Sequence, residues 1–149
     1  MEASFAVLRA FGIDFEARIT SAHRTPEATK TFVQDAEKRG CAVFIAAAGM
    51  AAHLAGAVAA TTVKPVIGVP MNASMDGLDA LLSTVQMPAG IPVATVAIGK
   101  AGAKNAAYLA VQMLSLADAK LARALSDERA ANAQEIYAKD AALQQTLRG

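Results

Sequence analysis

The chain has 149 residues, of which 54% are hydrophobic, and it carries a formal net charge of +1 at pH 7. The apolar content argues against intrinsic disorder, and the length suits one domain with a substantial core. The near-neutral charge, with no cluster of lysine and arginine, argues against a nucleic-acid-binding surface.

Helical and extended segments are expected to alternate along the chain. Apolar residues recur at helical spacing in some segments, and alternate or run continuously in others. Thr25 and Pro26 are typical of a helix start, with Thr25 as the cap, and Gly12 and Gly40 of helix ends. The expected helices cover residues 2–11, 26–39, 51–61, 77–84 and 103–116, and the chain is helical from there to about residue 147. The expected strands cover residues 15–20, 41–47, 65–69 and 92–98.

This alternation predicts a parallel sheet with helices on both faces. We therefore expect a single three-layer α/β domain over residues 1–149, with residues 117–149 as a C-terminal helical extension. The uncharged stretch 41–60 is long enough to cross a membrane, but its glycines and central His53 favour a strand, a turn and a buried helix. The N-terminus shows no secretory signal, and the lone Cys41 fits a reducing compartment, so a cytoplasmic location is expected.

Each of the two histidines follows an expected strand: His23 comes before an expected helix, and His53 lies near the first turn of another. In open parallel sheets, such strand-to-helix turns line the crevice where ligands bind. His23 stands next to Arg24, and a helix cap does not explain this pair. An imidazole exchanges protons near neutrality, while a guanidinium beside a helix N-terminus suits phosphate or carboxylate. The turn 21–26 is therefore a candidate site for proton transfer on an anionic small molecule.

His53 allows two interpretations of equal weight from the sequence alone. A histidine among alanines can be a core residue bonded to a carbonyl. The preceding run of small residues, 46–52, would instead let a ligand approach the backbone N–H groups.

Other motifs carry weaker signals. Two histidines without a carboxylate cluster or a cysteine pair make a poor metal site, so no metal is expected. Residues 99–102 (Gly-Lys-Ala-Gly) lack the spacing of a Walker motif and are expected to begin a packed helix. The loop 71–76 is expected near the crevice, without an assigned role. The two-proline turn 86–92 is either a rigid surface loop, or a wall of the site or a subunit contact.

Five motifs together resemble a known family, the class I 5-(carboxyamino)imidazole ribonucleotide mutases of purine biosynthesis, also called the PurE family or the phosphoribosylaminoimidazole carboxylase catalytic subunit. The resemblance covers essentially the whole chain. The motifs are Ser-Ala-His-Arg-Thr-Pro (21–26), Ala-Ala-His-Leu (51–54), Pro-Val-Ile-Gly-Val-Pro (65–70), Gln-Met-Pro-Ala-Gly-Ile-Pro-Val (86–93) and Ala-Ile-Gly-Lys-Ala-Gly-Ala-Lys-Asn-Ala (97–106).

The resemblance implies a flavodoxin-like fold, assembled as a homo-octamer with sites at subunit junctions. It also implies an isomerase that converts 5-(carboxyamino)imidazole ribonucleotide to 4-carboxy-5-aminoimidazole ribonucleotide without a cofactor. His23 would be the general acid and base, and Ser21 and Arg24 would hold the ribose phosphate. The remaining substrate-binding residues would be Ala22, Ala48, Gly49, Met50, Ala51, Ala52, His53 and Leu54, of which the backbone at 48–52 would cradle the migrating carboxylate.

One departure from the family affects the expectation. Its members normally begin with a strand that ends in Gly-Ser-x-Ser-Asp, and residues 1–14 do not supply it. The strand and motif are therefore expected to be missing. Two alternatives stay open beside the mutase: a carboxylase that takes free CO2 and aminoimidazole ribonucleotide, and a non-catalytic oligomeric scaffold or binding protein. The carboxylases typically carry a serine-asparagine pair where this chain has Ala52-His53.

Overall fold

The computed structural model describes residues 1–148 and divides into two compact units, residues 1–113 and the residues from Leu114 onward. The first unit holds the sheet and the helices that cover it, and the second holds one long helix. In chain order the elements are α1 (Glu2–Ala10), α2 (Pro26–Lys38), β1 (Phe44–Gly49), α3 (Leu54–Ala59), β2 (Val66–Met71), the 3-10 turn η1 (Met75–Gly77), α4 (Leu78–Val85), β3 (Ala94–Thr95), α5 (Gly99–Ser115) and α6 (Ala119–Arg148).

The three strands form one parallel sheet in the order β1-β2-β3. Phe44 lies opposite Val66 at one end of the first pair, and Gly49 lies opposite Met71 at the other. The central strand β2 is buried from Val66 to Pro70, because it has a neighbour on each side and helices above and below.

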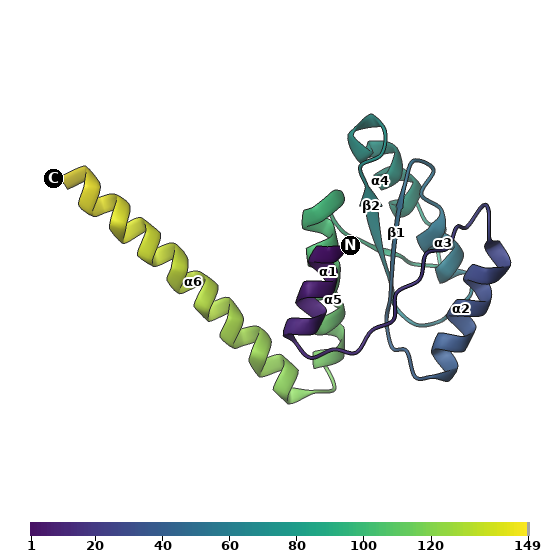
Figure 1. Ribbon diagram of the computed structural model, residues 1–149, viewed down its shortest axis with the longest axis horizontal. Helices are drawn as coiled ribbons and strands as arrows, with labels where there is room; N and C mark the ends of the chain where they lie inside the picture. The colour runs from purple at the N-terminus through teal and green to yellow at the C-terminus, as the bar shows by residue number, and fades with distance from the viewer. Residues whose placement is uncertain (149) are drawn as a thin grey trace. The chain divides into compact units, whose positions relative to one another are not determined.

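Helices cover both faces of this sheet (Figure 1). Alternate strand residues point to opposite faces, so Phe44, Ala46 and Val66 pack against α2 and α3. Ile67 and Val69 pack on the other face, against the alanines of α5. These two clusters are the core, and they confirm the predicted α/β architecture with a parallel sheet and helices on both faces.

The expected strand at residues 15–20 is wrong. No ladder hydrogen bond reaches this segment, and Ile19 is fully exposed. Alternation shows which side chains could be buried, but a strand also needs a partner strand, and none pairs with this segment in the described part of the chain. Side-chain contacts hold it instead. Phe15 stacks on Phe5 of α1 with ring centroids 5.2 Å apart, and Glu16 forms an ion pair with Arg39.

Two further strands differ from the expected bounds. β1 begins three residues later than predicted, because the ladder starts where the Phe44 amide donates to the Pro65 carbonyl. β3 is reduced to Ala94–Thr95, since Pro92 has no N–H to donate. The stretch 41–60 holds β1, a turn and α3, as predicted. Among the described residues, no helix combines the length and apolarity needed to span a membrane.

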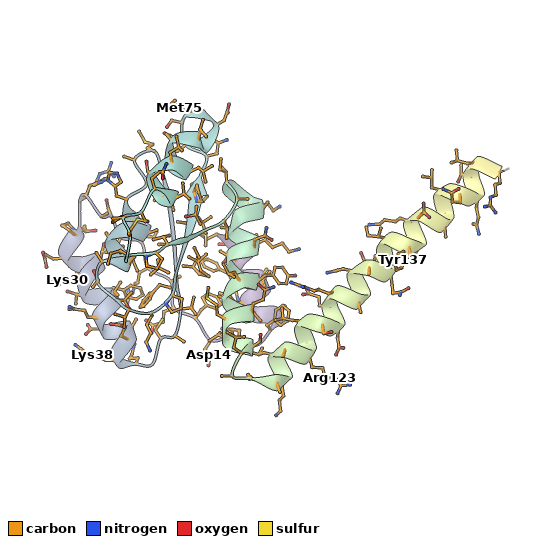
Figure 2. All side chains as sticks on the ribbon, turned by 180° about the vertical axis from the view of Figure 1, so that it is seen from behind. Asp14, Lys30, Lys38, Met75, Arg123 and Tyr137 are labelled. Carbon is orange, nitrogen blue, oxygen red and sulfur yellow. The ribbon has the colours of Figure 1, made fainter. Side chains whose placement is uncertain are left out.

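In the second unit, α6 is a single helix of 30 residues, in line with the predicted C-terminal helical segment. Its surface is largely polar, and Figure 2 shows Arg123 and Tyr137 projecting from it. Several large apolar side chains along it are exposed, namely Ile136, Tyr137, Leu143 and Leu147.

Candidate active site

A tight hydrogen-bonded turn presents His23 just before α2. The Ser21 hydroxyl oxygen accepts bonds from the backbone N–H groups of His23 (3.3 Å) and Arg24 (3.1 Å). The Thr25 hydroxyl accepts from the Ser21 amide at 2.9 Å, and the Thr25 amide donates to the Ser21 carbonyl at 3.0 Å. Thr25 does occupy the N-cap position, but its side chain makes no cap bond, because it is engaged with Ser21. The turn is therefore fixed by its own side chains, and His23 and Arg24 are left facing solvent.

A second short connection, at the carboxyl end of β1, carries His53. Gly49 ends β1 close to the loop that follows β2, where a Cβ added to Gly49 would lie 2.8 Å from the Cβ of Ala73. Met50 then adopts a left-handed conformation with φ of 56°, which is unfavourable for a side chain of its size. Ala52 is buried, and the His53 amide donates to the Ala51 carbonyl at 2.9 Å. His53 occupies the N-cap position of α3, with its side chain exposed.

The two histidines meet at this edge of the sheet. Nε2 of His23 lies 2.8 Å from Nδ1 of His53, within hydrogen-bond distance, although the residues are 30 positions apart in sequence. The ring centroids are 4.9 Å apart and the ring planes are nearly perpendicular, at 86°. The prediction that both histidine-bearing turns reach one crevice is therefore matched by direct contact of their side chains.

The pair lies at the mouth of an open cleft of about 550 Å³. Three short segments form its walls: the turn before α2, the helix α3, and the end of α4 with the residues after it. The lining residues are Ala22, His23, His53, Gly56, Ala57, Leu82, Ser83, Gln86 and Met87. Apolar walls with a few convergent polar groups are typical of small-molecule sites.

The comparisons with known proteins point to one family. The family model described as AIR carboxylase matches residues 1–135. The chain belongs to the AIR carboxylase family. Curated relatives include an N5-carboxyaminoimidazole ribonucleotide mutase of Methanocaldococcus jannaschii, which is 50% identical over 93% of this chain and 85% of its own length. A mutase of the same name from Saccharolobus solfataricus is 57% identical over 82% of this chain and 77% of its own length.

A solved structure supports the same assignment. The crystal structure of Treponema denticola PurE superposes on this AIR carboxylase family member with a TM-score of 0.82 and 32% identity. The match covers 94% of this chain and 87% of the other. The flavodoxin-like three-layer architecture that the sequence resemblance implied is thus confirmed.

The predicted site residues divide into two groups in this family member. Ala22, His23 and His53 line the cleft. The other predicted site residues do not line the cleft; they are Ser21, Arg24, Ala48, Gly49, Met50, Ala51, Ala52 and Leu54. Ser21 supports the turn, and Ala52 is buried below His53. The Arg24 side chain is exposed, and its guanidinium makes no hydrogen bond or ion pair with the described residues, so it is available to an anion.

The wall contributed by α4 was missed by sequence reasoning. Leu82 and Ser83 gave no signal, because a short apolar helix is indistinguishable from one that only packs on the sheet. Gln86 and Met87 begin the two-proline turn, for which a site wall was one of the interpretations left open, and the cleft favours it for these two residues. The loop 71–76 was expected near the crevice, and Ala73 does lie against Gly49 at the end of β1.

No third metal-binding side chain stands beside the two histidines. Within residues 1–148, no three His, Cys, Asp or Glu residues gather in the arrangement that a metal ion requires. The titratable side chains that line the cleft are the two imidazoles, and Arg24 lies in the same turn as His23.

Proposed function

We propose that this chain is a 5-(carboxyamino)imidazole ribonucleotide mutase, an isomerase of purine biosynthesis that produces 4-carboxy-5-aminoimidazole ribonucleotide. One observation carries the proposal: in a chain about half identical to mutases of that name, the two histidines touch at the edge of a cleft. A pair of imidazoles is suited to moving a proton between two positions of one small substrate.

His23 is the general acid and base of the proposed reaction. It gives a proton to the carbamate nitrogen as the N–C bond breaks, so that the bond's electron pair stays on nitrogen and the carboxylate leaves as CO2. The C4 carbon of the imidazole then attacks the trapped CO2 and forms the new C–C bond. His23 takes the proton that C4 loses. One proton leaves and one returns, and no oxidant or reductant is consumed.

The surrounding residues have binding roles in the same proposal. Arg24 and Ser21 hold the ribose phosphate, because a guanidinium offers two parallel donors and the turn places them beside the N-terminus of α2. The backbone from Ala48 to Ala52 cradles the migrating carboxylate, with His53 beside it. Ala22 and Leu54 are further substrate-binding residues. The apolar side chains of Leu82 and Met87 help to keep CO2 in the cleft and water out of it.

We also propose that the chain forms a homo-oligomer, an octamer by the family resemblance, in the cytoplasm. An exposed apolar stripe at helical spacing supports contact with a second copy: Met75, Leu78, Leu82 and Val85 run along η1 and α4. Figure 2 shows Met75 at the outer end of this stripe. The free Cys41 is compatible with a reducing compartment. Light scattering after gel filtration would measure the oligomer.

The test is a substrate comparison on the purified chain. In one arm it receives 5-(carboxyamino)imidazole ribonucleotide without added bicarbonate, and in the other aminoimidazole ribonucleotide with bicarbonate. We expect rapid formation of 4-carboxy-5-aminoimidazole ribonucleotide in the first arm only. Faster turnover in the second arm would assign the chain to the CO2-using carboxylases. A folded chain that is silent in both arms would favour a scaffold or binding protein.

A further inference from the structure

We propose that His53 is a positioning residue for His23, whose imidazole it holds through the bond between Nδ1 of His53 and Nε2 of His23. The inference rests on the proposed function, because it assigns how the acid and base of that reaction is kept ready. The proposed function only places His53 beside the carboxylate. The further proposal gives its side chain one defined partner, His23, and one protonation state.

The backbone of His53 is anchored next to the core, whereas that of His23 lies in a hydrogen-bonded turn at the surface. The His53 amide donates to the Ala51 carbonyl, and its carbonyl accepts the first helical bond of α3, from Ala57, at 2.9 Å. Ala52, one residue before His53, and Ala55, two residues after it, are 1% and 2% exposed, so the start of α3 is anchored in the core. His23 instead stands on a surface turn. Its ring is exposed, and among the described residues its one hydrogen-bond partner is His53. His53 therefore restrains the orientation of the His23 ring.

The hydrogen bond makes the tautomers of the two rings depend on each other. A hydrogen bond between two ring nitrogens contains one proton, so one nitrogen donates and the other accepts. The bond survives with one ring charged, but not with both. An acid that gives and then regains one proton alternates between imidazolium and neutral imidazole. The simplest arrangement that serves both states keeps the proton of the pair on Nε2 of His23, donated to an unprotonated Nδ1 of His53.

This arrangement assigns a separate task to each nitrogen of His23. Nε2 keeps its proton throughout, and Nδ1 is left to exchange protons with the substrate. His53 stays neutral with its own proton on Nε2, and it stabilises His23 when that ring is charged. The same logic operates wherever the hydrogen bond at one ring nitrogen decides which form the other nitrogen presents.

Two substitutions at position 53 distinguish a positioning role, through the hydrogen bond to His23, from a role in packing or substrate binding. His53→Asn places an amide oxygen close to where Nδ1 stands, so it can still accept from His23. His53→Leu keeps similar bulk and has no acceptor. We expect His53→Leu to lower kcat by about 10-fold to 100-fold, the loss typical when the outer partner of a functional imidazole is removed, with KM within about twofold of the parent. His53→Asn should recover most of that kcat.

Nitrogen-15 NMR of the histidine-labelled full chain tests the pair without any turnover. Its couplings should show Nδ1 of His53 unprotonated and Nε2 of His23 protonated, with the His23 signals broadened or shifted in His53→Leu and restored in His53→Asn. A chain that lacks activity altogether would refute the proposed function while this readout still reports on the pair.

Several results would overturn the inference. They are a protonated Nδ1 on His53, His53→Leu with the parent kcat, His53→Leu with a raised KM alone, and His53→Asn as impaired as His53→Leu. Circular dichroism and oligomer size, compared with the parent, establish that each variant is folded.

Discussion

Arg39 and Glu16 are joined by two parallel hydrogen bonds: Nε of Arg39 donates to Oε1 of Glu16 and Nη2 donates to Oε2, both at 2.9 Å. Arg39 directly follows α2, whereas Glu16 lies in the segment that was expected to be a strand. The Glu16 carboxylate raises the pKa of the Arg39 guanidinium. In the absence of ladder bonds, this ion pair and the Phe5–Phe15 stack hold the segment to the helices around it.

Glu16→Gln should loosen this segment without unfolding the domain. The next basic residue, Arg18, is exposed, and its trypsin cleavage reports on the segment. We expect cleavage after Arg18 to accelerate by about twofold to fivefold, the range typical of an exposed ion pair. Asp35→Asn is the matched control, because it breaks the exposed pair with Lys38 on α2 and leaves Glu16 intact. Equal cleavage rates for the parent and Glu16→Gln would remove the ion pair from this role.

Gly68→Ala should destabilise the whole sheet unit. A Cβ at this central position of β2 would lie 2.3 Å from Cγ2 of Thr84 and 2.9 Å from Cγ1 of Val93. Overpacking a tight core costs about 1–3 kcal/mol, and urea unfolding followed by circular dichroism measures it. Gly56→Ala is the control, since its new Cβ meets only the Met87 side chain, at 3.4 Å or more, and alanine favours the helix. Similar stabilities for the two variants would show that α4 moves aside.

His23→Asn should remove most of the turnover and leave the fold unchanged. The side chain would no longer exchange a proton, and general acid-base groups contribute about 10²-fold to 10⁴-fold to the rate. The turn itself uses the backbone N–H of residue 23, which asparagine retains. Steady-state kinetics and oligomer size are the measurements. Retention of the full rate would exclude His23 from the chemistry.

Arg24→Lys should weaken substrate binding more than it slows turnover. Lysine keeps the charge and loses the two parallel donors, so KM should rise about tenfold or more, since a hydrogen bond to a charged group contributes about 1.5–3 kcal/mol. Lys38→Ala is the control, because this side chain stands at the opposite end of α2, as Figure 2 shows. A parent-like KM in Arg24→Lys, or an equal rise in the control, would contradict a specific phosphate contact.

Cys41 should react slowly with iodoacetamide in the folded protein. Burial raises the pKa of its thiol, and the Sγ–H donates to the Val43 carbonyl. A raised pKa lowers the thiolate fraction at neutral pH, so the labelling rate should increase as the pH rises toward that pKa. Mass spectrometry compares the folded chain with the chain in guanidinium. Faster labelling of the folded chain at pH 7.5 would contradict a shielded thiol.

The sequence pattern predicted the elements whose signals are local. The helix at 26–38 has its start at Thr25-Pro26 and its end before Gly40, so the structure reproduces it almost residue for residue. A strand depends on its neighbour, which local patterns do not contain. The alternation at 15–20 was therefore misleading, and β1 and β3 kept only the residues that find a hydrogen-bond partner on β2.

In the candidate site, too, the features with local sequence signals were predicted and those that depend on distant residues were not. Parallel topology predicted that the turns of His23 and His53 would share an edge of the sheet. His53 does follow β1, but the strand expected before His23 is absent from the described residues, so the place of His23 does not follow from topology. Topology could not predict the contact of the two rings, which depends on the geometry of both turns and on the left-handed Met50. The α4 wall was hidden because apolar residues that line a cleft look like apolar residues that fill a core.

In the proposed mechanism turnover depends on the histidine pair, so activity would report whether the elements around the pair are assembled. Its two members come from turns that the α2–β1–α3 layer holds in place, so neither local segment can form the pair alone. Any treatment that separates these elements would abolish the contact before the secondary structure itself is lost. The activity that remains after heating or storage would therefore measure the fraction of molecules in which these elements are still packed together. Circular dichroism would report that fraction poorly, because the long helix α6 contributes much of the helical signal.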